Sequence, residues 1–206
     1  MSAPVLFGAA YSVYARIARL ALIEKDVPFR FEEIDIFGEV PADYLARHPF
    51  KRIPALEHDG FRLFETAAIT RYVDEAFPGP ALQPADARGR ARMAQVIGLV
   101  DQYFYWPAVR VVYVQRKEEA GDEAAIAAAL PQVETALDTL EQLAEGTPWL
   151  IGAEITLADL QLAPAMDYFQ RTPEGSEMLP ARPKLAAWWE RVRRRPSLVE
   201  TPFAAR

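Results

Sequence analysis

Three hydroxyl side chains stand close together near the start of the chain, where an apolar run over residues 4–8 gives way to a helical pattern. Tyr11, Ser12 and Tyr14 are followed by Arg16, one helical turn beyond Ser12. A serine at this place commonly caps the helix by accepting a hydrogen bond from a backbone N–H of the first turn. The same hydroxyl could donate a hydrogen bond to a ligand, so these residues alone leave both roles open.

Two further residue pairs stand at predicted element starts, one before a strand pattern and one before a helical pattern. Ile53-Pro54 precedes a short apolar segment, and Glu65-Thr66 opens a second helical pattern. Free N–H groups and the positive end of the helix dipole make a helix start suitable for an anion, so Thr66 stands where an anion would bind. The alternatives are a simple cap at Thr66 with a favourable charge at Glu65, and a trans proline at a strand start.

The composition excludes several kinds of chemistry. The chain has no cysteine, which excludes disulfides, thiolate metal sites and a cysteine nucleophile. Its two histidines, His48 and His58, form no cluster with metal-ligand spacing, so we assign no metal. A formal net charge of −6 over 206 residues provides no overall positive field for a nucleic acid or an anionic membrane as partner.

The basic run Arg191 to Arg195 is the exception to this acidic balance. It closes an aromatic-rich helical stretch, where cations offset the negative end of the helix dipole, and we interpret it as helix stabilisation. The uncharged first residues lack a preceding Lys or Arg and are interrupted by Gly and Pro, so neither a signal peptide nor a membrane span fits. We therefore expect a soluble, cytoplasmic protein.

The first part of the chain alternates strand and helix patterns. Strand patterns over residues 4–8 and 27–37 flank a helical pattern that starts after Ser12, which predicts a βαβ unit. Asp59-Gly60 lies between two short apolar segments, which predicts an antiparallel hairpin with a type I′ turn. A helical pattern over residues 65–77 completes a βαβ-ββα order.

Helical patterns dominate the rest of the chain after a proline-rich segment. We predict a first domain over residues 1–77, a linker over 78–84 and an all-helical domain over 85–206. Pro107 and Pro131 should kink or interrupt the first two long helices of that domain. In ITLADL, Thr156 and Asp159 have the spacing of a capping box, whose role would be in folding and stability.

The order of these elements and motifs resembles the glutathione S-transferase superfamily, and in particular its serine-type, phi-like and bacterial members. The resemblance covers essentially the whole chain; its carriers are Ser12 with Arg16, Ile53-Pro54, Glu65-Thr66 and the ITLAD box. It implies a fold that is α/β plus all-α, with an N-terminal thioredoxin-like βαβ-ββα domain for glutathione followed by an all-helical domain. Glutathione would be a cosubstrate, with no other cofactor.

The resemblance also implies how glutathione would be held. A cis bond before Pro54 would turn the backbone of Ile53 into a groove, where it could pair with the main chain of the cysteinyl residue. Thr66 would bind the γ-glutamyl carboxylate and Glu65 the ammonium group. Family members often have Asn in place of His48, and the usual basic residues for the glycyl carboxylate are not visible, so Arg52 or Lys51 would replace them.

Ser12 then becomes the best candidate for activating the thiol. A free thiol has a pKa of about 8.5, and a hydroxyl that donates a hydrogen bond to the sulfur favours the reactive thiolate. Lowering that pKa by about two units needs only about 2.7 kcal/mol. Tyr11 is the runner-up donor. Arg16 would support the site through local structure or its field, the alternative being a surface cation.

An apolar acceptor pocket would hold a small hydrophobic electrophile. Helical aromatic residues are its candidates, although such residues are more often core; they are Tyr14, Tyr103, Tyr105, Trp106 and Tyr113, with Phe169 as an additional one. The predicted function is a homodimeric glutathione transferase of detoxification. The alternatives are a glutathione-dependent catabolic isomerase, dehalogenase or etherase, and a non-catalytic binding module on the same scaffold.

Overall fold

The computed structural model describes residues 2–144 and 148–205. The chain forms two compact units, residues 1–82 together with 196–206, and Gln83–Arg195. This division differs from the predicted domain limits at the C-terminus, where the last residues belong with the first unit and not with the helical one. The physical reason is that the last helix packs against the first helix of the chain.

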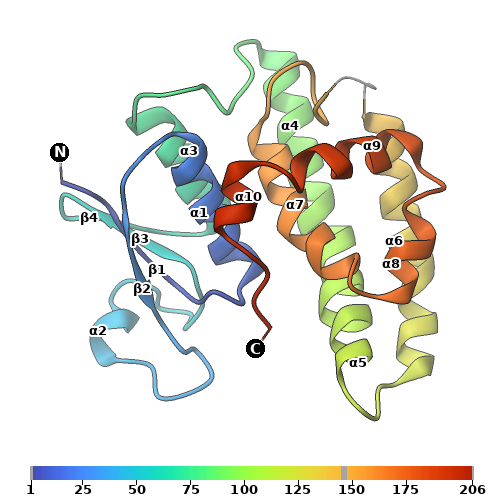
Figure 1. Ribbon diagram of the computed structural model, residues 1–206. Coiled ribbons are helices and arrows are strands. Elements are labelled where there is room, and N and C mark those ends of the chain that lie inside the picture. Colours follow the sequence, from blue (N-terminus) through green and yellow to red (C-terminus); the bar gives the residue numbers. More distant parts are fainter. Residues whose placement is uncertain (1, 145–147, 206) are drawn as a thin grey trace. The chain divides into compact units, whose positions relative to one another are not determined.

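The first unit is built on one mixed sheet of four strands in the order β2-β1-β3-β4. β1 pairs with β2 in parallel and with β3 in antiparallel orientation, and β3 and β4 form an antiparallel hairpin. The βαβ-ββα prediction is therefore confirmed, and the unit is thioredoxin-like (Figure 1). Its elements are β1 (Val5–Gly8), α1 (Val13–Glu24), β2 (Arg30–Glu33), α2 (Ala42–Leu45), β3 (Ala55–His58), β4 (Phe61–Phe64), α3 (Thr66–Ala76) and α10 (Pro196–Glu200).

The hairpin between β3 and β4 turns at the predicted residues. Asp59 and Gly60 both have positive φ, at 48° and 83°, as a type I′ turn requires. His58 pairs with Phe61 across this turn. The local residue types thus determine the register of the hairpin, which in turn determines where β4 ends and α3 begins.

α1 packs closely against β1 at Gly8. A Cβ atom at this position would lie 2.7 Å from the Cβ of Ala15 on α1. Ala15, Ala18 and Ala21 are completely buried along the same helix. Because these small residues let helix and strand approach closely, the turn between them, which carries Ser12, has a fixed place.

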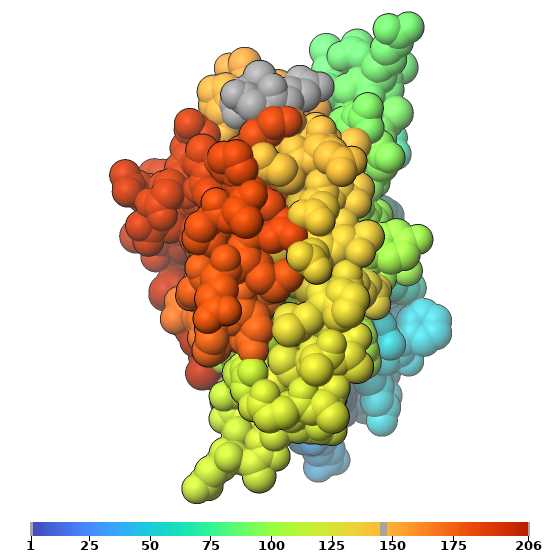
Figure 2. Space-filling model, turned by 90° about the vertical axis from the view of Figure 1, so that its right-hand side faces the viewer, coloured from blue at the N-terminus to red at the C-terminus, as the bar shows by residue number. Residues whose placement is uncertain are grey.

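The second unit is helical. It begins with α4 and the two π-helical segments η1 and η2, and the α-helices α5 to α9 follow. Figure 2 shows the face on which α6, in yellow, lies beside α9, and an ion pair of 2.6 Å joins Arg182 to Asp138 of α6. The elements are α4 (Ala87–Leu99), η1 (Val100–Phe104), η2 (Trp106–Tyr113), α5 (Val114–Lys117), α6 (Glu123–Leu143), α7 (Leu157–Phe169), α8 (Pro173–Met178) and α9 (Pro183–Val192).

The two prolines of the long helices behave differently. Pro107 is the second residue of η2, so the predicted disturbance appears there as π-helical pairing. Pro131 lies inside α6, which continues to Leu143, so of the predicted kink or interruption the interruption does not occur there. The buried face of α6, with Val133, Leu137 and Leu140, stabilises both halves as one helix.

The capping box at the start of α7 is present as predicted and is part of a larger network. Asp159, which is completely buried, accepts hydrogen bonds from the N–H and the hydroxyl of Thr156 at 2.7 and 2.9 Å. It also accepts from the Leu150 N–H and the Trp188 indole N–H, both at 2.9 Å. Burial raises the pKa of Asp159, and the four donated hydrogen bonds act in the opposite direction. One carboxylate thus joins α7, α9 and the segment before α7.

Replacing this carboxylate should strongly destabilise the second unit. Asp159→Ala leaves the N–H groups of Leu150, Thr156 and Trp188 buried without their acceptor, so we expect a loss of about 3 kcal/mol or more in the free energy of unfolding. Thr156→Ala should cost about 1 kcal/mol. Denaturant unfolding measures both.

The matched control is Asp167→Ala on the same helix. Asp167 forms an i,i+4 ion pair with Arg171 at 3.2 Å, and removing this pair should cost about 0.5 kcal/mol. An Asp159→Ala variant that loses no more stability than this control would contradict the importance of the network.

Candidate functional site

Ser12 is the N-cap of α1. Its Oγ accepts a hydrogen bond from the Ala15 N–H at 3.2 Å, and its backbone is extended. The capping interpretation is therefore correct. It does not compete with a binding role, because a hydroxyl that accepts a hydrogen bond still carries one proton to donate.

The neighbouring tyrosines lie in different surroundings. The Tyr11 hydroxyl is buried, and its ring packs beside Phe37, at a centroid distance of 6.1 Å, and against the cluster that contains Ile53. Tyr14 is half-buried on the first turn of α1. Of the two candidate donors, Ser12 is in the cap position, and Tyr11 has a buried hydroxyl and a ring that packs beside Phe37. Tyr11 packs against the same hydrophobic cluster that contains Ile53.

The peptide bond between Ile53 and Pro54 is cis, as the family resemblance implied. The Ile53 side chain is buried against Phe7 and Tyr44. Just before it, the Arg52 carbonyl accepts a hydrogen bond of 2.7 Å from the Tyr44 hydroxyl of α2. Burial raises the pKa of that hydroxyl, so it stays a donor. The short helix α2, which the sequence did not predict, thus holds the segment that leads to Ile53.

Glu65 and Thr66 form the start of α3 in an unusual geometry. Glu65 has φ +71°, a conformation that residues other than glycine rarely adopt, and its side chain makes no capping hydrogen bond. Thr66 is the buried first residue of the helix, and the first turn contains no acidic residue. Such local strain persists where the surrounding structure demands it, often at ligand sites. The start of α3 presents N–H groups suited to an anion.

His48 connects this helix start to the segment before the cis bond. Its ring lies 4.9 Å from that of Phe64 and is buried, and its Nδ1 has no hydrogen-bond partner among the described residues. Burial lowers the pKa of His48, the charge of Glu65 raises it and that of Arg52 lowers it. Arg52, His48 and Glu65 therefore gather in one region of the first unit. Arg52 itself is exposed.

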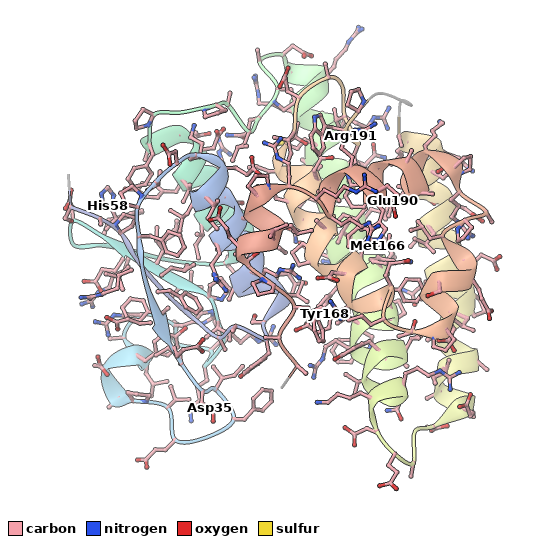
Figure 3. The ribbon with its side chains drawn as sticks, viewed as in Figure 1. Asp35, His58, Met166, Tyr168, Glu190 and Arg191 are labelled. Atoms are coloured by element: carbon pink, nitrogen blue, oxygen red, sulfur yellow. The ribbon has the colours of Figure 1, made fainter. Side chains whose placement is uncertain are left out.

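The predicted acceptor residues of the second unit differ in their exposure. Tyr103 and Trp106 are 58% and 62% exposed, and Tyr105 and Tyr113 are half-buried. Tyr113 packs edge to face on Tyr168 of α7 at a centroid distance of 4.8 Å. Tyr168, which is labelled in Figure 3, is a residue that the sequence did not single out. Burial raises the pKa of Tyr113. Phe169 is completely buried against Phe104, so it is a core residue.

The arginines at the end of α9 contact their own unit. Arg193 and Arg194 pair with Glu190 at 2.8 and 3.0 Å, and Arg195 lies 5.3 Å from the centre of the Trp149 ring. These contacts satisfy the basic run locally. Among the described residues, no group of three or more His, Cys, Asp or Glu could hold a metal ion. No described helix combines the length and the apolar character needed to cross a membrane.

Comparison with known proteins identifies the family. Residues 6–81 match the family model for the glutathione S-transferase N-terminal domain, and residues 103–196 match that for the C-terminal domain. Glutathione S-transferase F11 of Arabidopsis thaliana is 30% identical over 186 residues, which are 86% of this chain and 87% of the relative. Glutathione S-transferase PARB of Nicotiana tabacum is 32% identical over 188 residues, 87% of each chain.

Solved structures show the same fold. The crystal structure of poplar glutathione transferase F1 has a TM-score of 0.86 at 27% identity, covering 98% of this chain and 97% of the other. That of glutathione transferase F7 from Populus trichocarpa has a TM-score of 0.85 at 29% identity, covering 96% and 97%. This chain belongs to the glutathione S-transferase family.

The burial of His48 should make the stability of the protein depend on pH. The unfolded state takes up a proton near pH 6.5, whereas the folded state, in which the pKa of His48 is lowered, takes it up only at lower pH. The free energy of unfolding should therefore be unaffected by His48 above that pH and fall as the pH decreases below it. His48→Gln removes this contribution.

Denaturant unfolding of both proteins at about pH 8 and about pH 5.5 measures the effect. The stability difference between wild type and His48→Gln should shrink, or change sign, at the lower pH. A difference that stays constant between the two pH values would show that protonation of His48 does not oppose folding.

Proposed function

We propose that this protein is a glutathione transferase in which Ser12 stabilises the thiolate of glutathione and the helical unit supplies an apolar pocket for the electrophile. The supporting observation is that one unit combines a serine N-cap on α1, a cis bond before Pro54 and a strained start of α3 at Glu65. Membership of the glutathione S-transferase family supports the transferase activity and glutathione as cosubstrate.

The thiol chemistry follows from the start of α1. The Ser12 hydroxyl, whose oxygen already accepts the Ala15 N–H, donates its proton in a hydrogen bond to the sulfur. This bond and the positive end of the helix dipole favour the thiolate over the thiol. The thiolate then attacks an electrophilic carbon, the new C–S bond forms, and the leaving group departs with its electron pair.

The rest of the tripeptide is held by backbone and charge. The main chain of Ile53 pairs with the cysteinyl residue in a short form of strand addition. The γ-glutamyl carboxylate binds at Thr66 and the first N–H groups of α3, and Glu65 pairs with the ammonium group. For the glycyl carboxylate we propose Arg52 or Lys51, which are exposed and lie near His48 in the chain.

The electrophile is proposed to be small and apolar, as in detoxification of reactive compounds. Its pocket would use Tyr14 together with Tyr103, Tyr105, Trp106 and Tyr113. We propose that residues 1–77 bind glutathione, that residues 78–84 form a linker and that residues 85–206 supply the acceptor pocket. The last residues of the chain also pack with the first unit. A cytoplasmic location fits the absence of cysteine, because glutathione keeps that compartment reducing.

Calorimetric titration with glutathione and conjugation of an activated aryl halide test this function. The wild type should bind glutathione saturably and form the conjugate. Ser12→Ala should raise the pKa of the bound thiol by about one to two units and lower kcat/KM near neutral pH by about 10- to 100-fold. Ser12→Thr, which keeps the hydroxyl, and Tyr11→Phe, which loses the runner-up donor, are the controls.

The activities of the Ser12 and Tyr11 variants and the range of accepted substrates distinguish the alternatives. A Ser12→Ala enzyme with full activity would disprove the role of Ser12, and a large loss in Tyr11→Phe alone would transfer that role to Tyr11. Glutathione binding without turnover of any electrophile would replace the transferase by a binding module. Turnover of only isomerisation, dehalogenation or ether-cleavage substrates would indicate a catabolic enzyme.

We further propose that the protein forms a homodimer. Phe50, in the loop before the cis bond, is 69% exposed, which is unusual for so large an apolar side chain and suits a subunit interface. Light scattering should give about twice the chain mass, and Phe50→Ser should shift the equilibrium toward monomer. Val199→Ser, at a residue 63% exposed in the same unit, is the control. A monomeric wild type would contradict the proposal.

A further inference from the structure

A cavity of about 480 Å³ lies within the second unit, between α7, α9 and the segment that links α8 to α9. Small-molecule sites in proteins commonly have volumes in this range. α7 contributes Asp167 and Arg171 to the lining, and α9 contributes Trp189, Glu190 and Arg193. No residue that we propose for glutathione or for the electrophile lines this cavity. The proposed function therefore gives it no role.

Part of the lining is apolar. Leu179 and Trp189 border the cavity, although these residues are only 4% and 8% exposed. Pro180 and Ala186 extend this apolar surface. The lining residues of α9, from Ala186 to Arg193, are three or four positions apart, so a single face of the helix forms one wall. A ring that packs on this surface would lose much of its contact with water, which favours binding.

The charged part of the lining has an excess of positive charge. Arg193 and Arg194 donate to the same oxygen of Glu190, at 2.8 and 3.0 Å, and Arg171 pairs with Asp167 at 3.2 Å. Three guanidiniums thus share two carboxylates. The hydrogen bond from Arg193 holds the pKa of Glu190 below its usual value, so this carboxylate is ionised at neutral pH. Because a guanidinium has five N–H donors, Arg193 can keep this pair and bind a second carboxylate.

Contacts within the second unit fix the walls of the cavity. The side chain of Gln170, another lining residue, donates a hydrogen bond of 2.6 Å to the Gly175 carbonyl of α8. Arg182, buried just before α9, donates to the Met178 carbonyl at 2.6 Å and to Asp138 of α6 at 2.8 Å. α9, on which Figure 3 labels Glu190, is also tied to α7 by the indole hydrogen bond described above. A preformed cavity costs little conformational entropy when a ligand binds.

We propose that this cavity is a second ligand site, separate from the glutathione site, and that its ligand is a small aromatic carboxylate. The aromatic ring packs against Leu179 and Trp189, and the carboxylate binds the guanidiniums of Arg171 and Arg193. The excess of positive charge selects an anion over a neutral compound of the same shape. The basic run at the end of α9, which the proposed function does not use, thus contributes to binding.

Calorimetric titration with β-naphthoate tests the proposal, and the neutral β-naphthamide is the matched ligand. β-Naphthoate should bind the wild type saturably, with a Kd on the order of 10–100 μM. β-Naphthamide should bind at least about tenfold more weakly, because it cannot form charge-assisted hydrogen bonds with arginine. Saturating glutathione should leave the affinity for β-naphthoate unchanged, since the residues proposed to bind glutathione do not line the cavity.

The charge is tested with Arg193→Gln, which removes one proposed partner of the carboxylate. This variant should bind β-naphthoate about 5- to 20-fold more weakly and β-naphthamide as the wild type does. Arg191→Gln is the matched control from the same basic run. The Arg191 guanidinium donates to the Pro148 carbonyl and does not line the cavity, so this variant should keep the wild-type affinity within about twofold.

The place of the ligand is tested with Ala186→Phe, which fills part of the cavity and should abolish the binding of both ligands. Ala187→Phe, at the exposed next residue outside the lining, is the matched control and should bind like the wild type. Thermal unfolding shows whether each variant is folded. Should Ala186→Phe not fold, the two arginine variants decide: a loss of affinity confined to Arg193→Gln supports the proposal, and equal affinities overturn it.

Three further results would overturn the proposal. The first is a wild type that does not bind β-naphthoate saturably. The second is equal affinity for β-naphthoate and β-naphthamide, which would show an apolar cavity that does not select an anion. The third is binding that persists in Ala186→Phe or is lost in saturating glutathione, which would place the ligand elsewhere in the molecule. Whether the wild type binds glutathione at all tests only the proposed function.

Discussion

The close packing of α1 on β1 is the constraint from which the first unit derives its site. At Gly8 there is no room for a side chain, because a Cβ would come within 2.7 Å of Ala15. This contact sets the path of the turn between strand and helix and so the place of the Ser12 hydroxyl. α10 also packs against α1, and Leu198 and Thr201 at the C-terminal end of the chain accept hydrogen bonds from Arg16.

Two helix starts, rather than a set of charged side chains, provide most of the polar character of the site. α1 begins with a serine whose oxygen already serves the backbone, and α3 begins with a strained residue and no acidic group in its first turn. Fixed backbone dipoles cost little to organise when a ligand arrives.

Residue types a few positions apart were sufficient to predict turns and helix caps, because these features depend only on neighbouring residues. Asp59-Gly60 predicted its turn and Thr156 with Asp159 predicted the capping box, because each depends on residues a few positions apart. Contacts between distant residues were not predictable in this way. The hydrogen bonds of Arg16 to Thr201 and of Trp188 to Asp159 join residues far apart in sequence, and the positive φ of Glu65 arises from its surroundings, not from its residue type.

The two halves of the proposed chemistry differ in how tightly the structure specifies them. The proposed binding site for the glutathione thiol depends on backbone geometry. Buried contacts fix that geometry at Gly8 and at Tyr44, which holds the segment before the cis bond. The electrophile side depends on aromatic side chains of a π-helical stretch, of which Tyr103 and Trp106 are exposed and Tyr113 packs on Tyr168. Exposed aromatics can change with little loss of stability, since only the buried face of the helix contributes to the core. If the proposed sites are right, such a division would let the electrophile specificity vary while thiol activation stays constant.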